Sequence, residues 1–289
     1  MEMFIDALKD AGIDTLKLLP FLFLTYIIME WLERSTGEKQ ERMLKKAGAL
    51  GPLFGGIAGI VPQCGFSAAA ASLYAGGVIT TGTLLAVFLS TSDEMLPMLI
   101  SSRTDSSIIL HILLTKVCIG IVSGFVIDGV MRLIHFRADE RHIHDLCEAE
   151  QCGCEEEEGS ILKAAFIHTL HIALFVFAIS FVLTLAVECF GEDAIRSLLA
   201  SRRIIGVFLT SLVGLIPNCG ASVAITQLYL DGMLTGGQMM SGLLVSAGVG
   251  ILVLCRTNRH VKENLRIIVL LYACGVFWGL ILEAMGIVF

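Results

Sequence analysis

Two short motifs of matching composition, Pro62-Gln-Cys-Gly65 and Pro217-Asn-Cys-Gly220, lie in apolar surroundings 155 residues apart. Proline cannot donate a helical hydrogen bond and glycine permits irregular backbone, so each motif predicts a break in a helix. At membrane depth such breaks persist where they face protein or a water-filled cavity. We expect a substrate site formed by Gln63, Cys64, Gly65, Asn218, Cys219 and Gly220. The alternative is a pair of kinks whose small residues allow close helix packing.

Two acidic residues, Asp93 and Glu94, follow Ser90-Thr-Ser92 where an apolar segment is interrupted. Carboxylates beside hydroxyls suit a hard divalent cation such as manganese, which makes both residues candidate substrate and metal ligands. They equally suit the N-terminal cap of a short helix. The matching positions of the second half are Gly248 and Val249, so a cation site here is asymmetric.

Ionisable pairs lie near the start of two apolar segments. Asp14 and Lys17 are one helical turn apart, and His168 and His171 occupy the equivalent place in the second half. Two histidines at this spacing can share a metal or relay protons near neutral pH. We predict that the four residues couple protons to transport; the alternative is that they mark span ends and reach the headgroups. The candidate metal ligands are Cys64, Cys219, Asp93, Glu94, His168 and His171.

A polar segment between the halves concentrates imidazoles and thiols ahead of the acidic run Glu155–Glu158. Its candidate metal ligands are His142, His144, Cys147, Cys152 and Cys154. This density suits soft ions such as zinc or cadmium, although no paired Cys-x2-Cys motif is present. The segment is either a metal-loading loop or a solvated acidic linker.

Composition requires that these residues be positioned by membrane helices. Of the 289 residues, 55% are hydrophobic and 16% are charged, with a mean hydropathy of +0.81. One soluble core cannot bury so much apolar surface. The net charge of −7 excludes a nucleic-acid partner and leaves the lipid bilayer as the expected one. The class is therefore an all-α, polytopic membrane protein.

Apolar stretches of about 20 residues predict the membrane spans. Single spans are expected at Leu16–Leu32, Ile108–Val130, Ala164–Val187 and Ile267–Phe289. Two longer regions, Leu50–Ile100 and Ile204–Leu254, each hold two spans or three helices of which some are short or broken. The total is about ten helical segments.

The two halves of the chain are repeats. Besides the Pro-x-Cys-Gly motifs, the shift of 155 aligns further pairs in the same order: Gly51/Gly206, Tyr74/Tyr229, Gly77/Gly232, Thr80/Thr235, Gly124/Gly279 and Asp128/Glu283. This predicts a first transmembrane repeat at 1–133, a linker at 134–162 and a second repeat at 163–289. Five crossings in each half would invert the repeats, a frequent plan in secondary transporters.

These motifs resemble a known family. The stretch Gly56-Ile-Ala-Gly-Ile-Val-Pro-Gln-Cys-Gly65, the Gly76-Gly77 turn and Ser90–Glu94 are similar to the ten-transmembrane heavy-metal exporters, described variously as arsenic efflux proteins or manganese transporters. A more distant similarity is to permeases that export organoarsenicals, which carry Pro-x-Cys-x-Cys-Gly-like breaks. This chain has one cysteine per break instead of two.

We expect a secondary transporter of the inner cell membrane that exports a divalent or heavy-metal ion, with manganese the leading cargo, by alternating access. No ATP-binding Gly-x4-Gly-Lys-[Ser/Thr] motif occurs, so a proton gradient is the expected energy source. The alternative is efflux of arsenite, an organoarsenical or another anionic small molecule. No hydrolase signature supports an enzyme, the metal is substrate and not cofactor, and a homodimer is compatible with the sequence.

Overall fold

The computed structural model describes residues 50–60, 64–92, 95–133, 161–190, 203–258, 260–287 and 289, together with 8–9, 11–13, 15–17, 19–20, 22–24 and 26–27. In these residues the chain is helical and has no strand, which confirms the all-α class. Residues 50–58 are helical, and ten further helices have defined bounds. They are α3 (Cys64–Ala75), α4 (Thr81–Ser90), α5 (Met95–Ser101), α6 (Ser106–Leu133), α8 (Ile161–Phe190), α10 (Arg203–Gly214), α11 (Cys219–Leu230), α12 (Gly236–Val245), α13 (Gly250–Thr257) and α14 (Val261–Ala284).

Five stretches of the described chain are long and apolar enough to cross a membrane. They are Thr81–Ser101, Ser106–Leu133, Ala165–Val182, Gly236–Thr257 and Val261–Ala284. The helices α6, α8 and α14 correspond to three of the predicted single spans. The first and fourth stretches each consist of two helices, α4 with α5 and α12 with α13, and they are the most deeply buried of the five.

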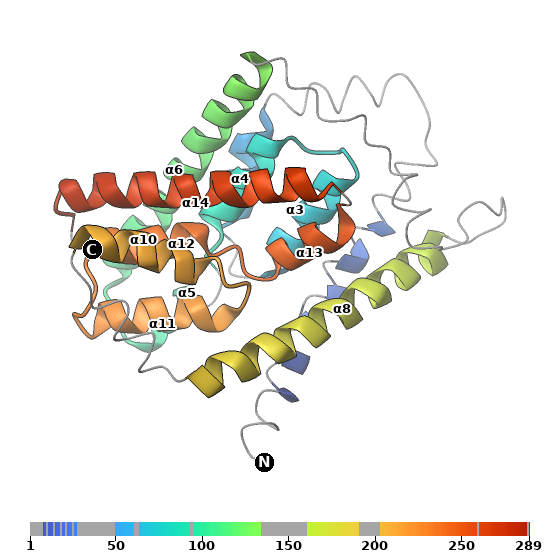
Figure 1. The fold of residues 1–289 in the computed structure, drawn as a ribbon, viewed down its shortest axis with the longest axis horizontal. Helices are drawn as coiled ribbons and strands as arrows, with labels where there is room; N and C mark the ends of the chain where they lie inside the picture. Colours follow the sequence, from blue (N-terminus) through green and yellow to red (C-terminus); the bar gives the residue numbers. More distant parts are fainter. Residues whose placement is uncertain are drawn as a thin grey trace.

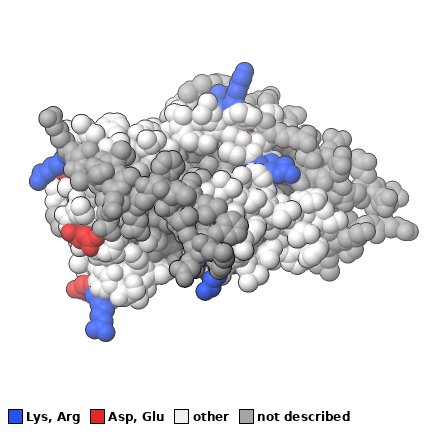
Figure 2. Space-filling view, turned by 60° about the horizontal axis from the view of Figure 1, so that its bottom comes forward, with Lys and Arg blue, Asp and Glu red and all other residues white. Residues whose placement is uncertain are grey.

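The outer surface is apolar, as a lipid-facing surface must be. On α6, Leu110, Leu114 and Phe125 are exposed, and on α14 the exposed residues include Val269 and Phe277. Figure 2 shows a face that is largely free of charge, with isolated charged side chains. This distribution, together with the apolar lengths, identifies a multi-pass membrane protein.

The helices of the two halves begin at matching positions. The helices α3, α4, α5 and α6 begin at residues 64, 81, 95 and 106, and α11, α12, α13 and α14 each begin 155 residues later. The turns before α4 and α12 match as well, since Gly77 and Gly232 both have a φ of 72°. The duplicated sequence therefore folds into the same order of helices twice.

The second Pro-x-Cys-Gly motif lies at the tip of a helical hairpin. Gly206 lies against Gln238 and Gly214 against Gly242, so α10 and α12 run in parallel. The chain must therefore return along α11 before α12 begins, and residues 215–218 form the tip. In the first half, Gly51 and Gly59 lie against Thr83 and Ser90 of α4, which places residues 50–58 and α3 in the same arrangement. The interruptions that divide single spans are instead those between α4 and α5 and between α12 and α13.

A peripheral layer flanks this core. In Figure 1, α8 lies along one side of the bundle, with the N-terminal helical stretches beside it. Tyr26 joins this layer to α3, because its hydroxyl lies 3.2 Å from the hydroxyl of Ser72. Arg256 of α13 lies over the ring of Phe175 in α8, 5.8 Å from its centroid. The interrupted spans consequently occupy the interior of the molecule.

Candidate substrate site

The tip of the second hairpin is organised by Asn218. This residue has extended backbone and caps α11, its side-chain oxygen accepting a bond of 3.0 Å from the N–H of Gly220. Side-chain amides satisfy free N–H groups at helix starts in this way. Gly220 is exposed, whereas its repeat equivalent Gly65 is buried. Cys64 and Cys219 are the first residues of α3 and α11.

The break between α4 and α5 is lined by three buried hydroxyls. Ser90 and Thr91 donate to the carbonyls of Ala86 and Val87, both at 2.7 Å. Ser92 donates to the carbonyl of Ile60 at 2.7 Å, which ties the break to the tip of the first hairpin. A hydroxyl that donates its hydrogen bond to a carbonyl can still accept through the lone pairs of its oxygen. These oxygens can therefore accept from a donor or coordinate a cation.

The break between α12 and α13 contains an unsatisfied hydroxyl. Ser246 is the C-cap residue of α12, and its N–H donates to the Gly242 carbonyl at 3.1 Å. Its side-chain oxygen is buried and has no hydrogen-bond partner among the described residues. A buried polar atom without a partner costs about 1–3 kcal/mol, and the Ser246 oxygen has lone pairs that can accept a hydrogen bond or coordinate a cation.

Half-helices from opposite repeats meet at the breaks. The first residue of α13, Gly250, lies against Ser67 in the first turn of α3, so closely that an added Cβ would be 2.8 Å from the Ser67 Cβ. Their repeat equivalents, α5 and α11, also pack together. The N-terminal ends of α3 and α13 therefore converge, and each carries a partial positive charge.

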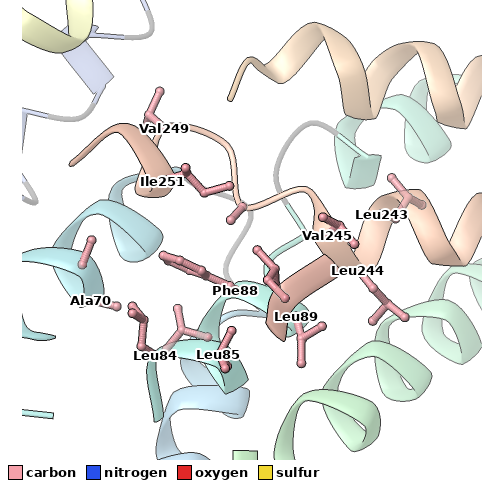
Figure 3. Packing of buried hydrophobic residues seen from close by; sticks show 14 of the residues in the cluster. Ala70, Leu84, Leu85, Phe88, Leu89, Leu243, Leu244, Val245, Val249 and Ile251 are labelled. Atoms are coloured by element: carbon pink, nitrogen blue, oxygen red, sulfur yellow. The ribbon is translucent and has the colours of Figure 1, made fainter. Parts of the chain in front are cut away.

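Apolar side chains pack together at the ends of α4 and α12. Phe88 and Leu89 at the end of α4 lie close to Leu244 and Val245 at the end of α12 (Figure 3). All four side chains are buried. The ends of α4 and α12 are therefore joined by packed hydrocarbon next to the breaks.

Matching carboxylates fix the starts of the two interrupted spans. Asp128 of α6 accepts from the Thr80 hydroxyl at 2.7 Å and from the Gly82 N–H at 2.8 Å. Glu283 of α14 accepts in the same way from the Thr235 hydroxyl. A carboxylate complements the positive end of a helix. Both groups therefore anchor the ends of α4 and α12 that are remote from the breaks.

The predicted proton-coupling set is described only in part. Lys17 and His171 have exposed side chains and belong to the peripheral helices. Asp14 and the side chain of His168 lie outside the described residues, as do Gln63, Asp93, Glu94 and the side chains of both motif cysteines. The predicted metal ligands of the loop between the halves also lie outside the described residues: His142, His144, Cys147, Cys152 and Cys154. In the part of the chain that is described, no three His, Cys, Asp or Glu side chains come together.

Sequence reasoning assigned no role to two groups at the breaks, Lys116 and Ser246. Lys116 of α6 is buried, and its ammonium donates to the carbonyl of Leu243 at 2.5 Å. A comparison of the two halves could have singled out Lys116, since the residue at the matching position is Leu271. A charged residue in one half that is replaced by an apolar residue in the other indicates that the two positions differ in role. Ser246, by contrast, is a common residue whose isolation is visible only in the fold.

A comparison with protein families matches residues 1–188 to the family described as "Putative, 10TM heavy-metal exporter". The chain belongs to this family, as the motifs predicted. Membership makes export across a membrane, and not catalysis, the activity that the family description names. No curated protein and no solved structure gave a significant match.

Proposed function

We propose that this heavy-metal exporter binds its cargo where the hairpin tips meet the two interrupted spans. The observation that most directly supports this proposal is that two buried spans are interrupted, and that each break lies beside a short helix of the other repeat. Interrupted helices at matching places in two halves are a recurrent construction of midplane substrate sites. The backbone groups released there are tolerated because they line a site.

Alternating access by two inverted repeats is the proposed mechanism. The start of α14 lies near the start of α4, since Tyr74 donates to Glu263 at 2.7 Å and lies 3.2 Å from the Thr81 hydroxyl. The end of α14, by contrast, meets the start of α12. The indole of Trp278 donates to Ser123 at 2.9 Å, and these two residues are each other's repeat equivalents. Contact between equivalent residues is expected on a two-fold axis, which supports inversion and rocking of one repeat against the other.

Manganese is the leading cargo in this proposal. Its support is the set of acceptor oxygens at the α4–α5 break, because hydroxyls and carboxylates suit hard divalent ions. Asp93 and Glu94 are the proposed carboxylate ligands, with the amides and thiols of the two tips completing the site. The proton-coupling residues would be Asp14, Lys17, His168 and His171, and the expected location is the inner cell membrane.

A second candidate is an anionic cargo, such as an arsenic oxyanion. The converging N-terminal ends of α3 and α13 and the buried ammonium of Lys116 favour negative charge. The two candidates differ in which side chains the cargo needs, since a divalent cation needs oxygen lone pairs and an anion needs donors.

The substitution Thr91→Val tests the site in a metal-sensitive host. It removes one hydroxyl oxygen from the break with little change of shape. Thr115→Val is the matched control, because Thr115 makes the same type of bond to a carbonyl one turn earlier, also at 2.7 Å, but lies on a half-exposed face of α6, whereas Thr91 is buried. We expect Thr91→Val to abolish manganese tolerance and Thr115→Val to preserve it. Equal tolerance in both variants, at equal protein levels, would remove the α4–α5 break from the site.

A further inference from the structure

Lys116 is a charged side chain in the interior of a membrane protein. It lies within α6, a span whose outer residues face lipid, yet only 1% of its surface is exposed. Its Nζ donates to the carbonyl of Leu243 at 2.5 Å. An ionisable group inside the hydrocarbon region is costly, and it is usually retained for function.

The bond from Lys116 holds one end of an interrupted span. Leu243 lies in the last turn of α12, which ends at Val245. The N–H that would continue the helical ladder to its carbonyl belongs to Ala247, beyond the helix end. Carbonyls in a last turn carry partial negative charge and attract cations. The ammonium therefore stabilises the present end of α12.

Lys116 also lies at the level of the α4–α5 break, as the contacts of α6 with α4 show. One turn further along, Gly120 lies against the carbonyl of Ala86 and the Cβ of Ser90, the last residue of α4. The helices α4 and α6 run in opposite directions, since Gly82 lies against Gly124 and Asp128. Lys116 therefore lies one turn beyond the end of α4, alongside the α4–α5 break, and bridges from there to α12.

Packing alone does not require a charge at this place. The repeat equivalent, Leu271 of α14, is fully buried, so the same fold accepts a leucine at the matching position. The helices α4 and α12, beside which Lys116 lies, contain no ionisable residue, and the sequence between α4 and α5 carries the two acids Asp93 and Glu94. The Lys116 ammonium thus places a positive charge beside the break that carries two acids in the first half and none in the second.

We propose that Lys116 is an internal positive charge that competes with the cargo, and that its ammonium and a divalent cation repel each other across the two breaks. In the unloaded carrier the ammonium ties the end of α12 to α6. Cargo binding at the breaks weakens that bond and frees α12 to move. Binding of the cargo is thereby linked to the switch of the site from one side of the membrane to the other. This inference rests on the proposed function, because it assumes that the breaks hold a cation.

The test uses the full chain in detergent and in proteoliposomes, with Mn²⁺ as the probe. The substitution K116L installs the residue found at the matching position, and K116M retains an unbranched side chain without charge. H111L, at an exposed position of the same helix, is the control. Removing one positive charge near a cation site raises cation affinity, so both Lys116 variants should bind Mn²⁺ about tenfold more tightly than the wild type or H111L. They should also exchange Mn²⁺ for Mn²⁺ while losing net transport.

A purely structural lysine predicts a different result. Loss of packing would lower affinity, exchange and net transport together, and that outcome in either folded variant would overturn the proposal. Unchanged Mn²⁺ affinity in both variants would overturn it too. If the wild type transports Mn²⁺ but the variants bind it no more tightly, only the role of Lys116 fails. If the wild type neither binds nor transports Mn²⁺, Zn²⁺ or Cd²⁺, the proposed function itself fails.

Discussion

The contact between α4 and α6 positions the α4–α5 break. Substitutions at two glycines of α6, one inside this contact and one outside it, test how close the contact is. A Cβ added at Gly124 would lie 2.6 Å from the carbonyl oxygen of Gly82 and 2.8 Å from the Cβ of Pro52. Ordinary contact begins near 3.4 Å, so Gly124→Ala would force the two helices apart by about 0.8 Å. At Gly129, five residues further along the same helix, nothing lies within 4 Å of the added Cβ.

The two alanine substitutions should therefore have opposite effects on stability. Each gains about 0.5–1 kcal/mol because alanine is the better helix former. Only Gly124→Ala also suffers the overpacking cost of about 1–3 kcal/mol, and the paired difference isolates that term. The repeat supports the comparison, because the equivalent of Gly124 is Gly279 and that of Gly129 is Ala284.

Equilibrium unfolding in mixed micelles with increasing SDS measures this difference. We expect Gly129→Ala to be more stable than the wild type by about 0.5–1 kcal/mol, and Gly124→Ala to be less stable than Gly129→Ala by about 1–3 kcal/mol. Manganese transport should fall with Gly124→Ala alone, because the break moves with α4. Equal stability of the two variants would refute the close contact between α4 and α6.

Five further substitutions, in three experiments, test the contacts around the interrupted spans. Asp128→Ala and Glu283→Ala should each lower the unfolding free energy by about 1–3 kcal/mol in the same assay, since each leaves a helix start without its acceptor; a loss in one variant only would argue against equivalent roles. Tyr74→Phe removes a bond to the carboxylate of Glu263 and should cost about 1.5–3 kcal/mol, and an unchanged unfolding midpoint would contradict that contact. A double-mutant cycle of Ser123→Ala and Trp278→Phe should give a coupling energy of about 0.5–1.5 kcal/mol, whereas simple additivity would place the two residues apart.

The sequence predicted the parts of the fold that hydropathy and duplication control. The spans α6, α8 and α14 follow from apolar length, and the shared shift of 155 anticipated matching helices in both halves. The sequence did not show that Pro217–Gly220 lies at the tip of a hairpin. A proline and a glycine interrupt a helix equally well in a kink and in a turn, and only the parallel course of α10 and α12 distinguishes them.

The candidate site was harder to predict because it is built from contacts between repeats. Ser90, Thr91 and Ser92 drew attention through the acids that follow them, but their bonds to carbonyls and to Ile60 depend on the packing of two segments. The placement of Lys116 against Leu243 joins residues 127 positions apart, which periodicity cannot reveal. Local pattern identifies residues that can do chemistry, and tertiary packing decides which of them meet.

Ion uptake into proteoliposomes is the most direct test of the central claim, that this family member moves a metal ion through the junction of the two breaks. Purified protein would be assayed with Mn²⁺, Zn²⁺, Cd²⁺ and arsenite, with and without a pH gradient, beside Thr91→Val and Thr115→Val. We predict uptake of a divalent cation, fastest for Mn²⁺, that a proton gradient accelerates and that only Thr91→Val abolishes. Transport of arsenite with refusal of every cation would contradict the metal-ion cargo, and cation transport that Thr91→Val leaves intact would contradict the site.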